Sequence, residues 1–230
     1  MHKDMLPAGE AGEKLQRYVD AIAAAPFNLT GYKTREAMLE GLIGDSYAAM
    51  AELYVPRGTR FLDIGSGSGV PGVVIAAAYP DCTGVLLDAN AKKIDFITRQ
   101  AAELGIGNVT AVCARAEEYC GAAEVRESFD FCVTKAFGPL YYSLEFSAPA
   151  LKVGGFLYIY SAIVQEDLHP ELAAFADALG YDAATGAERQ KRGLPARGLA
   201  WEKKRPTPAS YPRRFPVIKR EAARIPETIS

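Results

Sequence analysis

The sequence predicts an α/β protein with a doubly wound, mostly parallel sheet of seven strands, preceded by a helical extension. Short apolar runs alternate with helical patterns at intervals of roughly twenty to twenty-five residues, which indicates βαβ units. The first of these runs is followed by a glycine-rich turn at residues 65–72, as expected where a buried strand leads into a helix. Because crossovers between parallel strands are right-handed, helices should cover both faces of the sheet.

Length and composition indicate one globular domain with extensions. The chain has 230 residues, of which 49% are apolar and 23% are charged, and this is enough for a hydrophobic core. No run approaches the roughly 18 apolar residues of a membrane span. Residues 1–15 are charged and lack the apolar stretch of a secretory leader. We therefore expect a cytoplasmic protein without a membrane partner.

The first 56 residues are predicted to form the helical extension. An amphipathic helix that ends before Pro26 is indicated by the spacing of Leu15, Tyr18, Val19 and Ile22. A second helix is expected over residues 39–53, where apolar side chains repeat with a similar spacing.

Residues 57–205 are predicted to form the main domain, and residues 206–230 a basic, proline-rich tail. Five strands are expected at residues 60–64, 83–88, 109–113, 129–134 and 155–160, with helices at 73–79, 94–104, 141–151 and 168–179. Residues 185–190 and 199–203 are expected to close the sheet as a late hairpin. The prolines of the tail argue against regular structure there.

The cysteines and histidines do not have the spacing of a metal site. No two cysteines form a CxxC pair, and neither histidine is close to a cysteine in the sequence. We therefore expect no metal, and four reduced thiols that pack as small hydrophobic side chains. These thiols are Cys82, Cys113, Cys120 and Cys132.

Positive charge is concentrated near the C-terminus. Residues 189–224 contain twelve lysines or arginines and two glutamates, whereas the other 194 residues carry fourteen basic and twenty-six acidic side chains. This asymmetry predicts a segment that contacts a polyanion such as RNA. The alternative is a solvated tail without a partner. The candidate RNA-binding residues are Arg115, Arg189, Lys191, Arg192, Arg197, Arg213 and Arg214.

Two cofactors compete for the glycine-rich turn. Residues 67–72 satisfy G-x-G-x-x-G, the dinucleotide fingerprint, in which a helix N-terminus binds a pyrophosphate. Residues 63–69 instead resemble the first motif of S-adenosylmethionine-dependent methyltransferases, in which the carboxylate of Asp63 would hold the turn and the amino group of the cofactor. Asp88, at the end of the second strand, suits the ribose of either cofactor.

Later segments favour the methyltransferase. Residues 151–155 resemble the LKPGG turn before the fifth strand of many methyltransferases. Residues 115–118 follow the third strand, where methyltransferases contact the adenine. The sequence offers no second recognisable feature of a nicotinamide-dependent enzyme.

From about residue 18 to residue 214, the chain resembles the bacterial 16S ribosomal RNA guanine-N7 methyltransferases, also called glucose-inhibited division protein B. The matching motifs are NLT, GDS, DIGSGSGVPG, LD, KKI, RAE, KAF and PTP…YPRR, at residues 28–30, 44–46, 63–72, 87–88, 92–94, 115–117, 135–137 and 206–214. The resemblance implies a Rossmann-like sheet and S-adenosylmethionine as the methyl donor. It also implies that small-subunit ribosomal RNA, or the ribosomal particle, is the substrate.

The motifs point to a set of functional residues. Lys135 and Asn28 are the candidate catalytic residues, which would place or hydrogen-bond the target guanine. A solvated strand-end lysine and a turn residue are the alternatives. Because guanine N7 carries a free lone pair, no general base is expected, and positioning should supply most of the catalysis. The candidate cofactor-binding residues are Asp63, Gly65, Ser66, Gly67, Gly69, Val70, Asp88, Ala89, Ala116, Glu117 and Lys135.

The chain departs from the family pattern at four places. The tryptophan-asparagine pair that usually precedes NLT is replaced by alanines and Pro26. Leu42 replaces a histidine, and Ser161 lies in a YSA run that replaces LKG. Lys135 replaces the arginine of RAF and lacks its planar fork. Two alternatives therefore remain beside the ribosomal RNA methyltransferase. One is an NAD-dependent oxidoreductase, and the other is a non-catalytic or re-targeted RNA-binding paralogue.

Overall fold

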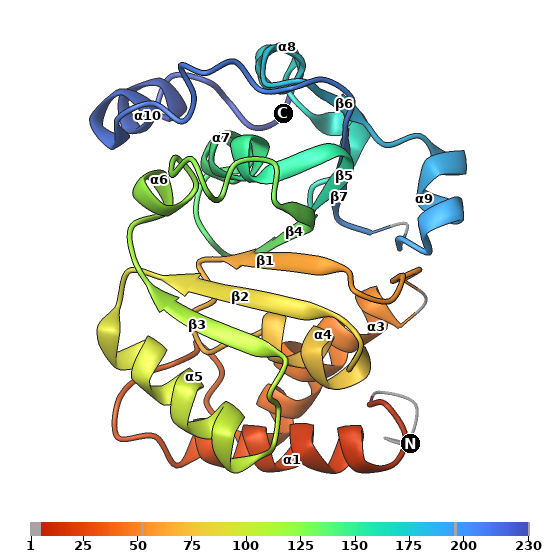
Figure 1. Ribbon diagram of the computed structural model, residues 1–230, viewed down its shortest axis with the longest axis vertical. Coiled ribbons are helices and arrows are strands. Elements are labelled where there is room, and N and C mark those ends of the chain that lie inside the picture. Colours follow the sequence, from red (N-terminus) through yellow and green to blue (C-terminus); the bar gives the residue numbers. More distant parts are fainter. Residues whose placement is uncertain (1–5, 52, 196, 230) are drawn as a thin grey trace.

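The computed structural model describes residues 6–51, 53–195 and 197–229. The strands of its central sheet are β1 (Arg60–Ile64), β2 (Thr83–Asp88), β3 (Val109–Cys113), β4 (Phe129–Lys135), β5 (Leu151–Tyr160), β6 (Tyr181–Ala183) and β7 (Leu199–Lys203). Their order in the sheet is β3-β2-β1-β4-β5-β7-β6 (Figure 1). β1 to β5 are parallel, and β7 is antiparallel to β5 and β6. The predicted seven-stranded, mostly parallel sheet is confirmed.

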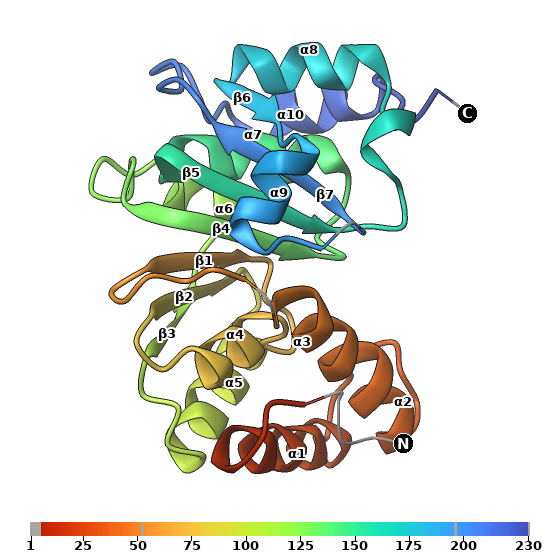
Figure 2. The same ribbon diagram turned by 90° about the vertical axis from the view of Figure 1, so that its right-hand side faces the viewer.

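Helices cover both faces of this sheet (Figures 1 and 2). One face carries α1 (Glu10–Ala23), α2 (Arg35–Ala37), the π-helical segment Met38–Gly44, α3 (Asp45–Met50), α4 (Gly72–Ala78) and α5 (Ala91–Glu103). The other face carries α6 (Ala116–Tyr119), α7 (Leu140–Ala150), α8 (Pro170–Ala178), which a 3-10 turn at Gln165–Asp167 precedes, and α10 (Phe215–Ala222). α9 (Gly186–Arg192) lies beside the β5–β7–β6 end of the sheet.

Side chains that alternate along the strands build one hydrophobic core on each face. Phe61 of β1 belongs to the core under α1, α4 and α5, and it stacks on Phe131 with ring centroids 5.5 Å apart. Leu62 and Ile64 belong to the core under α7 and α8. Because successive residues of a strand face opposite sides, Asp63 lies on the same face as Phe61. This alternation decides which way the functional side chains of β1 and β4 point.

The second N-terminal helix differs from the prediction of one regular helix over residues 39–53. Its middle part, Met38–Gly44, is π-helical, and the N–H of Asp45 donates to the carbonyl of Glu40, five residues back. The carbonyl oxygens of Gly41 and Leu42 accept hydrogen bonds from the Lys135 ammonium, each at 3.2 Å. Widened helical turns often mark functional positions, and here one meets the end of β4.

The predicted late hairpin is half wrong. β7 forms as expected, but its antiparallel partner is β6, and residues 186–192 form α9 instead of a strand. The hydroxyl of Thr185 accepts the N–H of Glu188, whose carboxylate accepts the N–H of Thr185. This capping box is a helix-start signal in the sequence, and it outweighed the weak strand pattern.

The prediction that the prolines of the tail exclude regular structure is also wrong. α10 begins at Phe215, and Pro216 lies in its first turn, where a missing N–H costs no hydrogen bond. Ile218 is fully buried and joins the core of α7 and α8. The C-terminal segment therefore packs on the domain.

The predicted limits of the three regions, at residues 56/57 and 205/206, stay predictions. Residues 1–5 lie outside the described residues. They belong to the predicted extension and to the charged stretch 1–15, for which the sequence predicts no secretory leader. Among the residues that the structure does describe, no helix is long and apolar enough to cross a membrane.

Candidate active site

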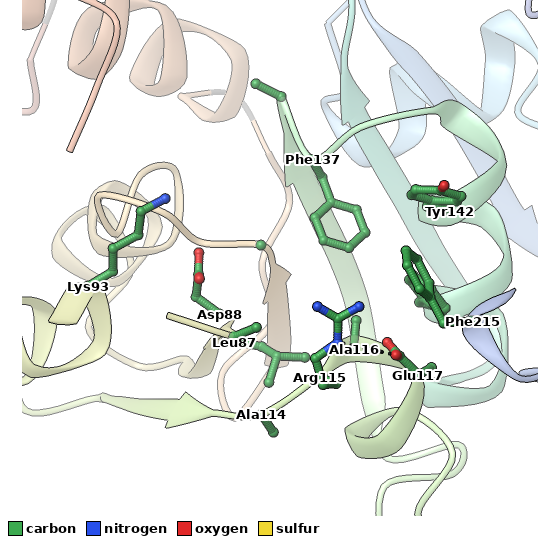
Figure 3. A pocket seen from close by; sticks show the side chains of 14 residues that line it. Leu87, Asp88, Lys93, Ala114, Arg115, Ala116, Glu117, Phe137, Tyr142 and Phe215 are labelled. Carbon is green, nitrogen blue, oxygen red and sulfur yellow. Dashed lines mark hydrogen bonds and ion pairs between the residues drawn. The ribbon is translucent and has the colours of Figure 1, made fainter. Parts of the chain in front are cut away.

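A cavity of about 330 Å³ opens at the carboxyl ends of β1 to β4 (Figure 3). The strand order reverses between β1 and β4, and doubly wound sheets bind their ligands at such a point. The volume lies within the range of small-molecule sites. The cavity is lined by Gly65, Leu87, Asp88, Ala89, Lys93, Ala114, Arg115, Ala116, Glu117, Ala136, Phe137, Tyr142, Phe146 and Phe215.

Some of the predicted cofactor-binding residues line the cavity, and the others do not. Those that line the cavity are Gly65, Asp88, Ala89, Ala116 and Glu117, and Arg115 of the predicted RNA-binding set joins them. Those that do not are Asp63, Ser66, Gly67, Gly69, Val70 and Lys135. The sequence motifs therefore predicted mainly the wall residues that follow β1, β2 and β3.

Most backbone N–H groups of the glycine-rich turn have acceptors within the protein. Those of Gly65 and Ser66 donate to the carbonyl of Leu87 at 2.8 and 2.9 Å. The N–H of Gly67 donates to a carboxylate oxygen of Asp88 at 2.9 Å. A pyrophosphate needs such groups free at a helix N-terminus. The turn therefore does not support the dinucleotide interpretation.

The side chain of Asp63 also accepts a backbone N–H group of this turn. Its Oδ2 accepts the N–H of Gly72, the first residue of α4, at 2.8 Å. The buried Asp63 carboxyl group thus occupies the helix N-terminus that a pyrophosphate would use. The side chain is fully buried, and its Oδ1 has no hydrogen-bond partner among the described residues. Asp63 holds the turn, as predicted, but it does not line the cavity.

Burial determines the protonation of Asp63. Loss of hydration raises the pKa of this carboxyl to about 7, against the lowering effect of the Gly72 hydrogen bond. The charge of Asp88 raises the pKa further, and the ammonium of Lys135 lowers it. Protonated and ionised forms of Asp63 are therefore both populated near neutral pH.

Replacing Asp63 with asparagine is expected to remove part of the pH dependence of stability. Because the folded pKa of about 7 exceeds the ordinary value of 3.8, the folded chain holds a proton that the unfolded chain loses between these values. The wild-type free energy of unfolding should then fall as the pH rises through this window, by about 4 kcal/mol at most. Asparagine keeps an oxygen for Gly72 without the charge.

Urea denaturation of both proteins at about pH 5 and about pH 8 measures this effect. The free energy of unfolding of Asp63→Asn, relative to the wild type, should be higher at the upper pH than at the lower. A difference that is equal at both pH values would show that Asp63 ionises in the folded protein as it does in the unfolded chain.

Lys135 extends from the end of β4 to the N-terminal extension. Besides the carbonyls of Gly41 and Leu42, its ammonium donates to the hydroxyl of Ser46 at 3.0 Å. Burial lowers the pKa of Lys135, while the charges of Asp45 and Asp63 raise it. The lysine thus joins two parts of the chain, and the cavity does not include it.

Asn28 is exposed and does not line the cavity. It lines a separate hollow of about 290 Å³ with Phe27, Thr30 and Tyr32 of the extension. Neither of the two predicted catalytic residues therefore lines the cavity, and their catalytic roles stay predictions.

Three of the predicted RNA-binding arginines away from the cavity wall have protein partners. Arg189 donates to the carbonyls of Pro195 and Gly198 at 2.7 and 3.0 Å. Arg192 is paired with Glu202 at 3.3 Å, and Arg213 is enclosed by acceptors from α7 and α10. These contacts engage part of the hydrogen-bonding capacity of each guanidinium group, and an RNA-binding role for the three arginines stays a prediction.

The remaining candidates do not lie on one surface. Lys191 lines a hollow at the amino ends of β1 and β4. The cavity lies at the opposite, carboxyl ends of these strands. Arg197 and Arg214 are exposed. Arg115 faces the cavity, where its guanidinium pairs with Glu117 at 3.2 Å and lies 4.9 Å from the ring centroid of Phe215.

Sequence reasoning missed eight residues of the cavity wall, and five of these carry an aromatic ring or a charge. Phe137 belongs to the KAF run and Lys93 to the KKI run, so both lay inside motifs whose individual roles were not assigned. Tyr142 and Phe146 are four residues apart on α7, a spacing that predicts a shared helix face. Phe215 directly follows YPRR, and nothing local connects it to the cavity.

The wall suits a nucleoside with a short polar tail. The carboxylates of Asp88 and Glu117 provide acceptors for hydroxyl and amino groups, and the rings of Phe137 and Phe215 provide flat apolar surface (Figure 3). The turn amides are engaged, and an acceptor oxygen of buried Asp63 is unpaired behind them. These features fit S-adenosylmethionine better than a dinucleotide.

Known proteins resemble this chain closely over most of its length. The model of the family described as rRNA small subunit methyltransferase G matches residues 11–182. The ribosomal RNA small subunit methyltransferase G of Fervidobacterium nodosum is 36% identical over 216 residues, which cover 94% of this chain and 100% of the relative. The protein of the same name from Deinococcus radiodurans is 36% identical over 192 residues, which cover 81% and 75%.

Solved structures share the fold at low sequence identity. The precorrin-6y C5,15-methyltransferase of Geobacter metallireducens has a TM-score of 0.51 and 19% identity, and the match covers 80% of this chain and 95% of that protein. The cyclase SpnF has a TM-score of 0.52 and 14% identity, with coverage of 78% and 75%. Because their names describe different reactions, the fold alone does not specify one. The family match and the curated relatives do show that the chain belongs to the rRNA small subunit methyltransferase G family.

Proposed function

We propose that this protein transfers a methyl group from S-adenosylmethionine to N7 of a guanine in the ribosomal RNA of the small subunit. As a member of its family, the chain is an S-adenosylmethionine-dependent methyltransferase. The observation that carries the proposal is the cavity at the strand-order reversal, whose turn amides are engaged and whose wall offers carboxylates and aromatic rings.

The cofactor supplies an electrophilic methyl group on a sulfonium. Guanine N7 has a free lone pair, so the protein need not remove a proton, and its contribution is to hold both partners in line. We propose that Asp88 orients the ribose and that Ala116 and Glu117 contact the adenine. Both oxygens of Asp88 accept backbone N–H groups, from Gly67 and Asn90, which hold the carboxylate in place.

We propose that Lys135 acts as a positioning residue. Its three hydrogen bonds hold the π-helical segment of the N-terminal extension at the carboxyl end of β4, beside the loop that carries Phe137. Ala136 in this loop has a φ of 53°, a strained conformation for a residue with a side chain, and such strain is often found at functional sites. The arginine that the family has at this position carries the same charge and can make similar hydrogen bonds. Lys135 therefore preserves the charge at this place.

We propose that the RNA contacts the exposed cations near the cavity. Arg115 lines the cavity, and Arg214 precedes the residue that forms its outer wall. Lys191 and Arg197 would meet only an RNA that extends around the domain, as a ribosomal particle does. This partner places the activity in the cytoplasm. The expectation that no metal takes part stays a prediction.

Calorimetric titration with S-adenosylmethionine, S-adenosylhomocysteine and NAD tests the cofactor. We expect binding of the first two and none of NAD. Transfer of a radioactive methyl group is then compared for small-subunit ribosomal RNA, the intact small subunit and transfer RNA. Borohydride and aniline treatment cleaves an RNA chain at N7-methylguanine. The position of the cleavage therefore identifies both the methylated atom and the nucleotide. Cofactor binding without transfer to any of these RNAs would favour a non-catalytic or re-targeted paralogue.

A further inference from the structure

The C-terminal segment forms one wall of the cofactor cavity. Phe215, the first residue of α10, lines the cavity together with Tyr142 of α7 and Arg115 before α6 (Figure 3). The rings of Phe215 and Tyr142 meet edge to face, with centroids 5.5 Å apart. The family model matches residues 11–182 and therefore does not include Phe215.

Contacts of Arg213, two residues before Phe215, fix the position of this part of the segment. The guanidinium of Arg213 donates to both carboxylate oxygens of Glu145, at 3.0 and 2.6 Å, and to Glu221 at 2.7 Å. It also donates to the hydroxyl of Tyr141 at 2.7 Å. These bonds attach both sides of the Arg213–Glu221 stretch to α7. The ring of Phe215 is therefore held in the wall by charged hydrogen bonds that do not involve the ring itself.

The segment is attached on either side of α10 as well. Before the helix, the hydroxyl of Thr207 donates to the carbonyl of Leu179 at 2.9 Å, and Arg126 donates to the carbonyl of Pro208 at 3.0 Å. After the helix, the carboxylate of Glu227 accepts the N–H of Leu140 at 2.6 Å. The segment thus runs across the domain as a fixed strap, and the half-buried ring of Phe215 points from it into the cavity.

The ring lies at the end of the cavity where a purine is expected. Asp88 and Lys93 line one end, and Phe215 and Tyr142 line the other, with Ala116 and Glu117 between them (Figure 3). With the ribose at Asp88, the flat apolar part of a nucleoside extends toward Phe215. Aromatic faces beside a cation suit a purine ring, because dispersion and the ring quadrupole both contribute.

We propose that Phe215 is a cofactor-binding residue, which closes the adenine end of the site and makes the C-terminal strap part of that site. This inference rests on the proposed function, because it takes S-adenosylmethionine as the ligand. It predicts that the strap is required for cofactor affinity, even though the motifs of the glycine-rich turn lie far from it in the sequence.

The test is calorimetric titration of the full chain and its variants with S-adenosylhomocysteine and with adenosine. Phe215→Ala should raise the Kd of both ligands by about the same factor, about tenfold, because adenosine contains the part that the ring contacts. Phe215→Leu, which keeps the apolar volume without the aromatic face, should give a smaller rise in the same direction. Val217→Ala is the control, since Val217 is half-buried on α10 and does not line the cavity.

Thermal unfolding of each variant separates a lost contact from a lost fold. A raised Kd in Phe215→Leu at an unchanged melting temperature supports the proposal. Wild-type affinity in both Phe215 variants overturns it, and so does an equal loss in Val217→Ala. If the wild-type chain binds neither S-adenosylhomocysteine nor adenosine, the proposed function itself fails, and this result is distinct from the variant results.

Discussion

Replacing Glu145 with alanine is expected to lower the free energy of unfolding by about 3–5 kcal/mol, because it leaves the Arg213 guanidinium without its main partner. The Glu145 side chain has no exposed surface, and both of its oxygens accept hydrogen bonds from Arg213 at 3.0 Å or less. These bonds raise the pKa of Arg213 above its usual value in the wild type. A guanidinium group stays protonated at neutral pH even without such bonds, so Arg213 stays charged in the variant. Only Glu221 would then neutralise it.

Urea denaturation at neutral pH measures this loss, and two variants control for it. Glu145→Leu combined with Arg213→Met removes both charges and should recover much of the stability, because the cost lies in the unpaired charge. Arg57→Ala breaks an exposed ion pair with Asp81 and should change stability by about 1 kcal/mol or less. If Glu145→Ala were no worse than Arg57→Ala, the network would not hold the strap to α7.

Replacing Gly65 with alanine should raise the Kd for S-adenosylhomocysteine by about a hundredfold. A Cβ at this position would lie 2.1 Å from Cδ2 of Phe137, so the ring must move, and both residues line the cavity. The glycine also has a φ of 74°, which costs a residue with a side chain about 1–2 kcal/mol. Steric conflict and backbone strain therefore act at the same place.

Gly58→Ala isolates the contribution of backbone strain. Gly58 has a φ of 77°, and a Cβ there would meet no atom within 4 Å. It precedes β1, at the end of the sheet away from the cavity. Calorimetry should show wild-type affinity for S-adenosylhomocysteine in Gly58→Ala, with a modest loss of melting temperature. Equal affinities in the two variants would mean that contact between Gly65 and Phe137 does not shape the cofactor site.

Short-range patterns in the sequence predicted the sheet and the turn. The bounds of β1, β2 and β3 match the expected strands, because each is a compact apolar run that ends at glycine, proline or a polar residue. Where two local signals conflicted, the prediction failed. At residues 185–190 the capping box prevailed over a weak strand pattern, and at Pro216 a proline opened a helix instead of excluding one.

The sequence by itself determined the doubly wound, mostly parallel class of the sheet, the glycine-rich turn and the family. The glycines, the apolar periodicity and the motifs are properties of neighbouring residues, and they are visible before the chain folds. It also located the parts of the cavity wall that directly follow β1, β2 and β3, since parallel strands end at one edge of the sheet.

Only the tertiary structure decided which charges face solvent and which side chains complete the site. Arg213 pairs with Glu145 across 68 residues, and Lys135 bonds Leu42 across 93, so the sequence could not show that these cations are occupied. Phe215 reaches the cavity because its neighbours anchor α10 on α7. Such partners meet only when the chain is folded. A buried charge requires a counter-charge, and the packing of the folded chain decides which residue provides it.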